Sequence, residues 1–520
     1  MPSPIPMLTD PPGWKPPKKT VSAMVTLALV SFLAALDSTI LVTILPVIAH
    51  ELDGSTIDSF WAGTSYLLSS AVSQPVIAML AQLFGSRALL VSCVFMFAVG
   101  SVICGLARSF TPLLVGRFSQ GVGGGGMITL VQTIFADLVP LRQRPRWFSL
   151  VLATWAAGSV IGPFVGSALA ERASFRWVFW INLPLCGIAL ALVPLCINSM
   201  NPRISFREAF LRIDWIGGLL FIASITSVLV GLSWGGVQFP WISKWTLLPI
   251  LVGTVGILVT NVWEHNFTQH PLLHISLFRS SSMVLAQGCA FLQGLILLCT
   301  LYYIPFYFAS VRLRPPIQSS ICILPLSCSL LPGSAVVSQL ISHTGLYQWA
   351  IWSGWLVTTL GAGLLLLLGS HSTPAVWVTI FIIFGLGNGA LLSAINFSIQ
   401  AIANPGDAGR AASMYTFFRS LGMAVGVAVG GNVFQNMMAH HLRDSALSKE
   451  IARDAEAYIQ VLRKMSDTNP VKRDILDAYL GGFHGVFFVL LGSSAVGLVI
   501  GPFIKRYSMD RVTGGFGAGN

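Results

Sequence analysis

The stretch LAALDSTILVTILP, residues 33–46, is largely apolar and carries a single carboxylate, Asp37, near its middle. Apolar blocks of this kind recur along the chain at roughly 20 residues each, the length that an α-helix needs to cross a bilayer. The whole chain is 54% hydrophobic and 9% charged with a mean hydropathy of +0.76, whereas soluble domains carry about 25% charged residues. The sequence therefore predicts an all-α polytopic membrane protein.

The apolar blocks predict fourteen membrane spans. Their cores lie near residues 22–46, 60–83, 88–107, 112–136, 148–170, 176–197, 214–234, 245–263, 283–309, 319–341, 349–369, 374–399, 412–436 and 481–504. The first block is too long for a signal-peptide core, and Pro46 with acidic residues follows it instead of a small-residue cleavage site. We expect this span to remain in the mature protein.

The net charge of +11 does not indicate a nucleic-acid partner, because the basic residues are scattered between apolar blocks and form no basic stripe. The eight cysteines fall within or at the edges of apolar blocks. This placement predicts neither a disulfide framework nor a cysteine metal site. We expect no metal and no cofactor.

The distribution of Lys and Arg predicts the orientation of the spans. With the N-terminus in the cytoplasm, fifteen of these residues face inward and six lie in short outer loops. The last outer loop, 437–480, carries seven basic and seven acidic residues. Within it, Glu450–Met465 has the helical apolar spacing of a surface helix. The stripe comprises Ile451, Ala455, Tyr458, Ile459 and Leu462.

Charges inside membrane spans are informative because burying one costs about 2.5 to 3.5 kcal/mol even on lenient scales. Three lie deep: Asp37, Arg117 and Arg419. At 1.5 Å per residue, Asp37 and Arg117 lie roughly 13 and 9 Å from the outer boundary, so they could pair. Asp37 is then either half of a structural ion pair or a titrating group on a transport pathway. Three other acids are expected to be solvated at cytoplasmic span ends: Asp137, Asp214 and Glu264.

Two glycine-rich stretches, GRFSQGVGGGG at 116–126 and GSVIGPFVG at 158–166, lie inside apolar spans. Small residues every four positions let helices approach closely, and Pro163 should bend the second stretch. A phosphate-binding loop is the alternative, but the Lys-Ser/Thr ending of a P-loop is missing. We therefore interpret both stretches as helix-packing surfaces.

Five short motifs occur in order along the chain. They are Leu36-Asp37-Ser38-Thr39-Ile40 with Leu45-Pro46; Gly116-Arg117 with Gln120-Gly121 and Gly123; Gly158, Gly162, Pro163 and Gly166; Phe175-Arg176-Trp177 with Phe179, Ile181-Asn182 and Pro184; and Phe417-Phe418-Arg419-Ser420-Leu421-Gly422. Together they resemble the fourteen-span drug:proton antiporters of the major facilitator superfamily, in particular the fungal members. The third motif is similar to that family's antiporter signature.

The resemblance implies a domain organisation. It consists of a cytoplasmic tail (1–21), a six-helix bundle (22–197), two inserted helices (214–263), a second six-helix bundle (283–504, including outer loop 437–480) and a cytoplasmic tail (505–520). A cavity near the midplane would open alternately to each face as the bundles rock.

One motif of the family is incomplete. The gating loop between the second and third spans keeps Gly85 and the second basic residue, Arg87, but has Gln82 where the pattern has Asp and Ser86 where it has Arg. A weaker echo, Gly345-Leu346-Tyr347, occupies the corresponding loop of the second half. The usual ion pair of the inner gate is therefore not expected here.

The resemblance and the deep charges together predict export of a small molecule in exchange for protons. Asp37 would be the proton carrier and Arg117 its modulator. Polar groups at lipid depth usually face inward, which predicts four residues of the cavity wall: Gln120, Asn388, Asn396 and Arg419.

The expected cargo is a neutral or weakly acidic amphipathic molecule, such as a fungal secondary metabolite, toxin or drug, because no second deep acid is available to hold a cation. We expect the plasma membrane as location and no obligate protein partner. A proton-coupled importer and a transporter-like nutrient receptor would share the fold. A membrane enzyme is disfavoured, since no span carries a His-x-x-x-His or paired-acid arrangement.

Overall fold

The computed structural model describes residues 16–41, 44–54, 56–197, 206–236, 238–268, 272, 278, 280–442, 450–453, 455–466 and 468–509. Parts of the expected tails, residues 1–15 and 510–520, lie outside this set. The described chain is helical throughout its length.

The first part of the chain contains α1 (Lys18–Ile40), α2 (Leu45–Glu51), α3 (Thr56–Phe84), α4 (Ser86–Leu106), α5 (Phe110–Leu138), α6 (Arg144–Arg172), α7 (Trp177–Trp180) and α8 (Asn182–Cys196). The middle contains α9 (Phe206–Leu211), α10 (Trp215–Trp234) and α11 (Lys244–Phe267). The remainder contains α12 (Ser281–Ser310), α13 (Pro316–Ile321), α14 (Leu324–Thr344), α15 (Gln348–Leu365), α16 (Pro374–Ile402), η2 (Pro405–Asp407), α17 (Ala408–His441), α18 (Glu450–Arg453), α19 (Ala455–Lys464), α20 (Pro470–Ile500) and η3 (Gly501–Phe503).

Twelve helical segments among the described residues are long and apolar enough to cross a membrane. Helices α5 and α15 are outside this set, so the predicted count of fourteen is not established by length and composition. Helix α5 is rich in glycine, which lowers its hydropathy, and it packs between α3, α4 and α17. Helix α15 packs against α16 and α20. A helix covered by its neighbours needs less apolar surface of its own than one that faces lipid.

Several helix boundaries follow from local sequence. Gly85 separates α3 from α4 with φ of 88°, and Gly345 ends α14 with φ of 69°. A residue without a Cβ adopts this left-handed region readily. Both loops therefore use a glycine with a positive φ, although their ψ values of 135° and 11° differ. Asp214 caps α10 by accepting the backbone N–H of Gly217 at 2.8 Å.

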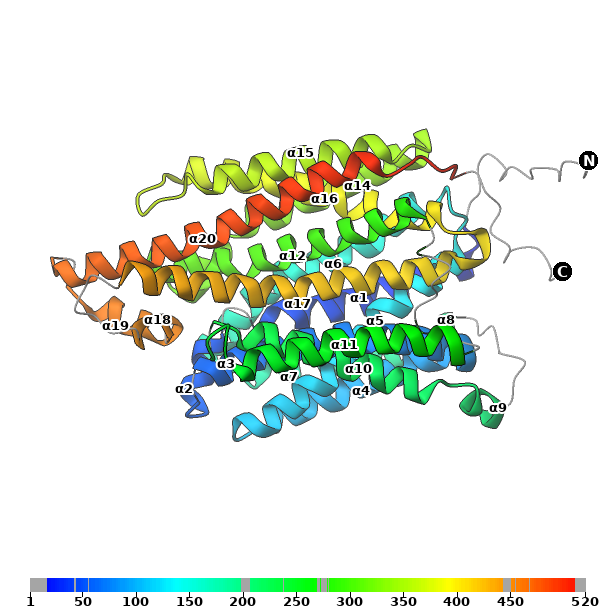
Figure 1. Ribbon diagram of the computed structural model, residues 1–520, viewed down its shortest axis with the longest axis horizontal. Helices are drawn as coiled ribbons and strands as arrows, with labels where there is room; N and C mark the ends of the chain where they lie inside the picture. The colour runs from blue at the N-terminus through cyan, green and yellow to red at the C-terminus, as the bar shows by residue number, and fades with distance from the viewer. Residues whose placement is uncertain are drawn as a thin grey trace, which may run out of the picture.

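The long helices lie side by side (Figure 1). In the first half, α1 packs along α6, and α5 packs between α3 and α4; in the second half, α14 packs along α16, and α12 along α17. The α10–α11 pair is peripheral, since α11 packs mainly on α10. Helix α11 exposes a run of apolar side chains that suits contact with lipid: Leu247, Leu248, Leu251, Val252, Val255, Leu258, Val259 and Val262.

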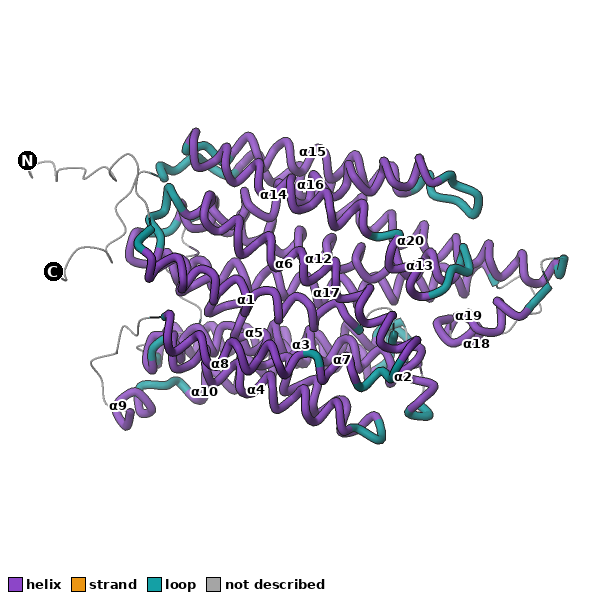
Figure 2. The backbone as a smooth tube through the Cα atoms, turned by 180° about the vertical axis from the view of Figure 1, so that it is seen from behind, coloured by secondary structure: helices purple, strands orange, loops and turns teal. Residues whose placement is uncertain are grey.

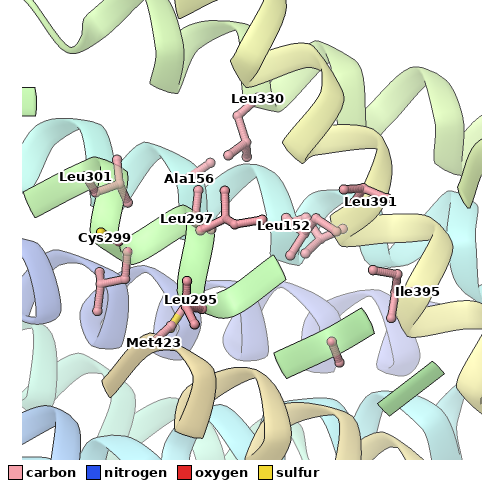
Figure 3. Packing of buried hydrophobic residues seen from close by; sticks show 14 of the residues in the cluster. Leu152, Ala156, Leu295, Leu297, Cys299, Leu301, Leu330, Leu391, Ile395 and Met423 are labelled. Atoms are coloured by element: carbon pink, nitrogen blue, oxygen red, sulfur yellow. The ribbon is translucent and has the colours of Figure 1, made fainter. Parts of the chain in front are cut away.

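Both halves contribute to a shared apolar core. Figure 3 shows side chains of α6, α12, α14, α16 and α17 meeting in one cluster. Its labelled members include Leu152, Ala156, Leu297, Leu330, Leu391, Ile395 and Met423. Inside a bilayer such contacts stabilise by van der Waals packing, because lipid tails are as apolar as leucine.

The two ends of the bundle carry different small helices. Helix α9 lies at one end, and α18 and α19 lie at the other (Figures 1 and 2). The predicted surface helix over 450–465 is present as α18 and α19, with residue 454 outside the described residues. Of the stripe residues, Ile451, Ala455, Ile459 and Leu462 are buried. Tyr479 of α20 donates its hydroxyl to the Ala455 carbonyl at 2.5 Å, which fixes these helices on the second half.

Two expectations were wrong. The first span does not run to residue 46 as one helix, because α1 ends at Ile40 and the separate helix α2 begins at Leu45. Pro46 suits the first turn of a helix, where no N–H is needed, better than a helix interior. Glu264 is not solvated, since it is 3% exposed and accepts the backbone N–H of Leu272 at 3.2 Å.

Candidate functional site

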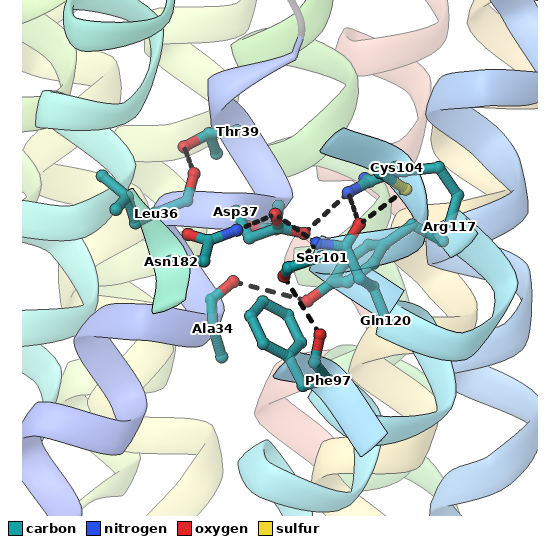
Figure 4. A network of polar contacts seen from close by, with 12 residues as sticks. Ala34, Leu36, Asp37, Thr39, Phe97, Ser101, Cys104, Arg117, Gln120 and Asn182 are labelled. Carbon is teal, nitrogen blue, oxygen red and sulfur yellow. Dashed lines mark hydrogen bonds and ion pairs between the residues drawn. The ribbon is translucent and has the colours of Figure 1, made fainter. Parts of the chain in front are cut away.

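Asp37 of α1 lies at the centre of a buried polar cluster (Figure 4). Arg117 Nη1 donates to Asp37 Oδ2 at 2.7 Å, while Gln120 Nε2 and Asn182 Nδ2 donate to Oδ1 at 3.1 and 2.8 Å. None of these four side chains is more than 1% exposed. The ion pair that depth alone indicated is therefore present, and three donors from α5 and α8 satisfy the carboxylate.

The cation of this pair is also held by the first half of the chain. Arg117 Nε donates to the Ala62 carbonyl of α3 at 3.2 Å, and Nη1 donates to Gln120 Oε1 at 2.8 Å. Gln120 Nε2 in turn donates to Ser101 Oγ of α4 at 2.8 Å. A buried ion pair is tolerated only when further hydrogen bonds satisfy both partners. This cluster meets that condition with contacts from five helices.

Glycines bring α6 against the segment of α1 that carries Asp37. A Cβ on Gly158 would lie 2.7 Å from the Phe32 carbonyl oxygen, and one on Gly162 would lie 2.9 Å from that of Leu36. Gly166 likewise has no room for a Cβ against α1. The packing interpretation of both glycine-rich stretches is confirmed, since the glycines of α5 press in the same way on α3 and α4.

Tyr66 of α3 separates the ion pair from a central cavity. The Arg117 guanidinium carbon lies 4.5 Å from the centre of the Tyr66 ring. Tyr66 lines the cavity together with Ser38 and Thr39, the two residues that follow Asp37. Asp37 itself is 0% exposed. Tyr66 therefore contacts the ion pair through Arg117 and also lines the space in which cargo could bind.

The cavity lies between the two halves. It is lined by Ser38, Thr39, Tyr66, Leu67, Ser70, Ile128, Trp155, Leu298, Leu301, Arg419, Ser420 and Met423. Its free volume is about 30 Å³, room for about one water molecule. The lining is mainly apolar and aromatic with one cation, the composition of a small-molecule site. In this conformation the cavity is closed down and must widen to admit an organic molecule.

Contacts between the halves lie on both sides of the cavity. Along α6, Trp155 lines the cavity, while Arg144 and Ser167 lie roughly 16 and 18 Å away in opposite directions. Arg144 Nη1 donates to Gln400 Oε1 of α16 at 2.9 Å, and the hydroxyls of Ser167 and Ser320 are 3.2 Å apart. Each end of the pathway is therefore bridged from one half to the other.

The incomplete gating loop has a partner that the sequence did not indicate. Arg410 of α17 donates through Nε and Nη2 to Gln82 Oε1 at 3.3 and 3.2 Å, and it pairs with Asp407 at 2.8 Å. Gly85 supplies the turn between α3 and α4, and Arg87 is half-buried at the start of α4. A hydrogen bond between the halves thus occupies the place where the family pattern has a charge pair.

The four residues expected in the cavity wall have three different environments. Arg419 lines the cavity. Gln120 belongs to the Asp37 cluster instead. Asn388 is buried in α16 and donates to the Phe384 carbonyl at 3.0 Å, away from the lining residues. Asn396 is also not among the lining residues and accepts from Gln400 Nε2 at 2.9 Å, next to the Arg144 bridge. The presence of a polar side chain within an apolar span therefore did not distinguish residues that line the cavity from residues that lie in contacts between helices.

Three important residues were missed. Arg144 is 1% exposed, although it is one of the fifteen basic residues expected on the cytoplasmic face, beside Arg142 and Arg146. The other two residues both contact Arg419. The Trp155 ring stacks on its guanidinium, and Gln293 accepts a hydrogen bond from its Nε. Gln293 could have been found by the criterion that selected Asn388, a polar side chain within an apolar span. Nothing in the sequence separates Trp155 from tryptophans that face lipid.

Long apolar helices packed around a closed central cavity, with a buried ion pair beside it, define a membrane transporter. Residues 27–427 match the model of the Major Facilitator Superfamily. The chain therefore belongs to this superfamily and is an integral multi-pass membrane protein, as the sequence motifs indicated.

Named relatives are fungal transporters. The chain is 38% identical to "MFS transporter L2" of Phoma sp., covering 96% of this chain and 83% of the relative. It is 32% identical to "Efflux pump FUS6" of Gibberella fujikuroi, covering 99% and 95%. It is 30% identical to the "Acurin A biosynthesis cluster MFS-type transporter" of Aspergillus aculeatus, covering 95% and 91%.

Two solved structures share the fold. A bacterial homologue of the human lysosomal transporter Spinster, inward-facing and occupied, superposes with a TM-score of 0.61 at 19% identity over 96% of this chain and all of that chain. The human organic anion transporter MFSD10 superposes with a TM-score of 0.61 at 13% identity, covering 94% of this chain and all of that chain. At these identities the likeness concerns the fold alone.

Proposed function

We propose that this protein exports a small amphipathic organic molecule, a fungal secondary metabolite, in exchange for protons. The export direction is supported by the relatives named as efflux pumps and by one named for a biosynthetic cluster. Proton exchange is supported by a single observation, the Asp37–Arg117 pair that lies behind Tyr66 beside the cavity. The neutral or weakly acidic cargo expected from the sequence fits a lining without a carboxylate.

The coupling we propose is a competition for one oxygen atom. A proton bound to Asp37 Oδ2 would compete with the Arg117 N–H that now occupies this position at 2.7 Å. The two residues lie on different helices of the first bundle, α1 and α5, so a shift of α1 relative to α5 during transport would change their separation. Arg117 stacks on Tyr66, and Tyr66 lines the cavity. Movement of Arg117 toward or away from the carboxylate is thereby linked to the shape of the cargo site.

The wider arrangement is also part of the proposal. All fourteen predicted segments cross the bilayer, with α5 and α15 included because neighbouring helices cover much of their surfaces. Six-helix bundles over 22–197 and 283–504 flank the inserted pair at 214–263. Both termini face the cytoplasm of a plasma-membrane protein, and export requires cargo, protons and lipid with no obligate protein partner.

Inside-out vesicles test this function, because an acidic lumen should then drive cargo inward. A panel of neutral and weakly acidic amphipathic fluorescent dyes is offered to vesicles with and without the protein. We expect gradient-driven accumulation of at least one dye with the wild type. Asp37→Asn keeps the size of the side chain but cannot titrate, so it should abolish this accumulation and leave dye-for-dye exchange largely intact.

The result also separates the alternatives. Gradient-driven accumulation that persists in well-expressed Asp37→Asn vesicles would exclude Asp37 as the proton carrier. A proton-coupled importer would move dye in the same direction as the protons, out of vesicles with an acidic lumen. A nutrient receptor would accumulate no dye under either gradient.

A further inference from the structure

Arg419 of α17 is a buried cation with no counter-ion in the part of the chain that the structure describes. Its side chain is 7% exposed and lines the central cavity. It makes no ion pair with any described residue: Nε donates to Gln293 Oε1 at 3.1 Å, and the guanidinium carbon lies 4.7 Å from the centre of the Trp155 ring. A charge buried without a partner is costly, and charges kept at this depth usually serve function.

Two hydrogen-bond donors at this position are unused. Among the described residues, neither Arg419 Nη2 nor Gln293 Nε2 has a hydrogen-bond partner, although both atoms are buried. Buried donors are normally satisfied, so such an exception needs an explanation. The two side chains are hydrogen-bonded to one another, and both unused groups are donors. Their common deficit is a hydrogen-bond acceptor, and beside a guanidinium the favoured acceptor is an anion.

The backbone around Arg419 is held firmly. A Cβ on Gly294 of α12 would collide with the Arg419 carbonyl, and a Cβ on Gly422 of α17 would collide with the Phe291 carbonyl. The glycines thus allow α12 and α17 to touch at the level of Arg419, which sets the guanidinium beside Gln293. On the other side, Trp155 of α6 covers the guanidinium face. The geometry is built from both halves of the transporter.

We propose that Arg419 and Gln293 bind a carboxylate or a comparably acidic group of the cargo, and that the apolar body of the cargo packs on Trp155 and Tyr66. This inference rests on the proposed export function and narrows its substrate class to organic anions. A carboxylate accepts two hydrogen bonds in one plane, which matches a guanidinium donor beside an amide donor.

The surroundings disfavour the other cargo classes. The lining residues include no carboxylate that could hold a cationic cargo. Asp37 is the one acid among the three deep charges, but it is 0% exposed and already accepts three hydrogen bonds. A neutral cargo would leave the Arg419 charge uncompensated in a widened cavity. An anion compensates it and also satisfies the unused donors.

Naphthoate and naphthamide are suitable probes, because they share shape and aromatic surface and differ in charge. Binding to the purified full-length protein is measured by equilibrium dialysis. We expect the wild type to prefer naphthoate by at least about tenfold, or about 1.4 kcal/mol. Arg419→Gln should remove the preference, and Gln293→Leu should reduce it. Arg419→Lys should retain part of it, since Lys keeps the charge without the planar fork.

Two further variants keep the test specific. Arg212→Gln removes an exposed positive charge from the turn that follows helix α9 and should leave the preference unchanged. Asp37→Asn should also retain it, so a failure of proton coupling and a failure of this inference give different results. Equal binding of both probes, no naphthoate binding by folded wild type, or an unchanged preference in monodisperse Arg419→Gln protein would each overturn the proposal.

Discussion

Two buried arginines, Arg117 and Arg419, lie near the same cavity in opposite halves of the molecule. Each stacks on an aromatic ring of the cavity wall, Arg117 on Tyr66 at 4.5 Å and Arg419 on Trp155 at 4.7 Å. Arg117 has a carboxylate partner at 2.7 Å, whereas Arg419 has none among the described residues. The same residue type beside the same cavity therefore has opposite electrostatic surroundings.

The presence or absence of a carboxylate partner distinguishes two kinds of site: Arg117 belongs to an internal polar cluster, and Arg419 belongs to the proposed binding site. The Arg117 charge is neutralised within the first half, and the Tyr66 ring shields its cluster from the cavity. The Arg419 charge has no carboxylate partner among the described residues, and in our proposal the cargo neutralises it. Removing one partner of a satisfied buried pair strands the other charge, whereas removing an unpaired cation relieves a cost.

The largest expected effect is on stability. Arg117→Leu should lower the free energy of unfolding by about 3–5 kcal/mol, because it leaves Asp37 buried and unpaired. Arg419→Leu should lower it less or raise it, since it leaves only the neutral Gln293 Oε1 without its donor and no unpaired charge. Thermal unfolding in detergent, followed by the loss of monodisperse protein, compares the two variants. Equal destabilisation would remove the distinction between the two arginines.

A double variant sharpens the same comparison. Asp37→Asn combined with Arg117→Gln removes both charges and keeps polar groups, so it should recover much of the stability lost by Arg117→Leu. If the pair serves proton coupling, gradient-driven accumulation should remain absent in this stable protein. Recovered export would instead indicate a purely structural ion pair.

A smaller effect is expected from the glycines that position each arginine region. Gly162→Ala pushes a methyl group against the Leu36 carbonyl of α1, and Gly422→Ala pushes one against the Phe291 carbonyl of α12. Overpacking of this kind costs about 1–3 kcal/mol. We expect Gly162→Ala to impair gradient-driven accumulation and Gly422→Ala to weaken the preference for naphthoate. Both properties are measured for both variants.

Gly492→Ala is the matched control for this pair. A Cβ at Gly492 of α20 would meet no atom within 4 Å, and alanine favours helix more than glycine does. The variant should therefore keep both transport properties and unfold no more easily than the wild type. If the Gly162 and Gly422 variants behave alike, the two sites are not independent.

The smallest expected effect is at the inner gate. Gln82→Glu turns the hydrogen bond to Arg410 into an ion pair, worth up to about 1 kcal/mol at an exposed position. Access to the cavity from the side that carries Gln82 should slow by at most about fivefold. Ser38 lines the cavity, so a Ser38→Cys variant in a background without other reactive cysteines reports on this access. The measurement is the rate at which an impermeant maleimide labels that cysteine.

Arg410 itself provides the control for the gate. In an Arg410→Ala background the carboxylate introduced by Gln82→Glu has lost its partner, so labelling should no longer slow. Slowing that persists there would mean that the new charge acts elsewhere. This result would place the inner gate outside the Gln82–Arg410 contact.

Much of the fold could be predicted from local sequence. Apolar blocks of membrane length gave the helices, and the surface helix over 450–465 followed from its apolar spacing. The glycine rows predicted close helix contacts correctly, because a missing Cβ has one clear consequence inside a membrane. The break between α1 and α2 was missed, since the apolar run continues through it even though the helix does not.

The candidate site was predictable only in part. Asp37 and Arg117 stood out because a charge in an apolar span is rare and expensive, and their depths agreed. Gln120, Asn388 and Asn396 were chosen by the same rule, yet they make hydrogen bonds within or between helices. The rule says that a polar group must avoid lipid, and a helix contact achieves this as well as a cavity does.

The sequence by itself determined that this chain spans a membrane many times, that it has three deep charges, and that glycines let certain helices touch. These properties depend on composition and on spacing along one helix. Only the tertiary structure decided which charge found a partner: Arg117 meets Asp37 and two amides, whereas Arg419 meets Gln293 and Trp155. The sequence gives depth along a helix axis, but pairing depends on the rotation of each helix and on its neighbours, which are fixed by packing between residues far apart in the chain.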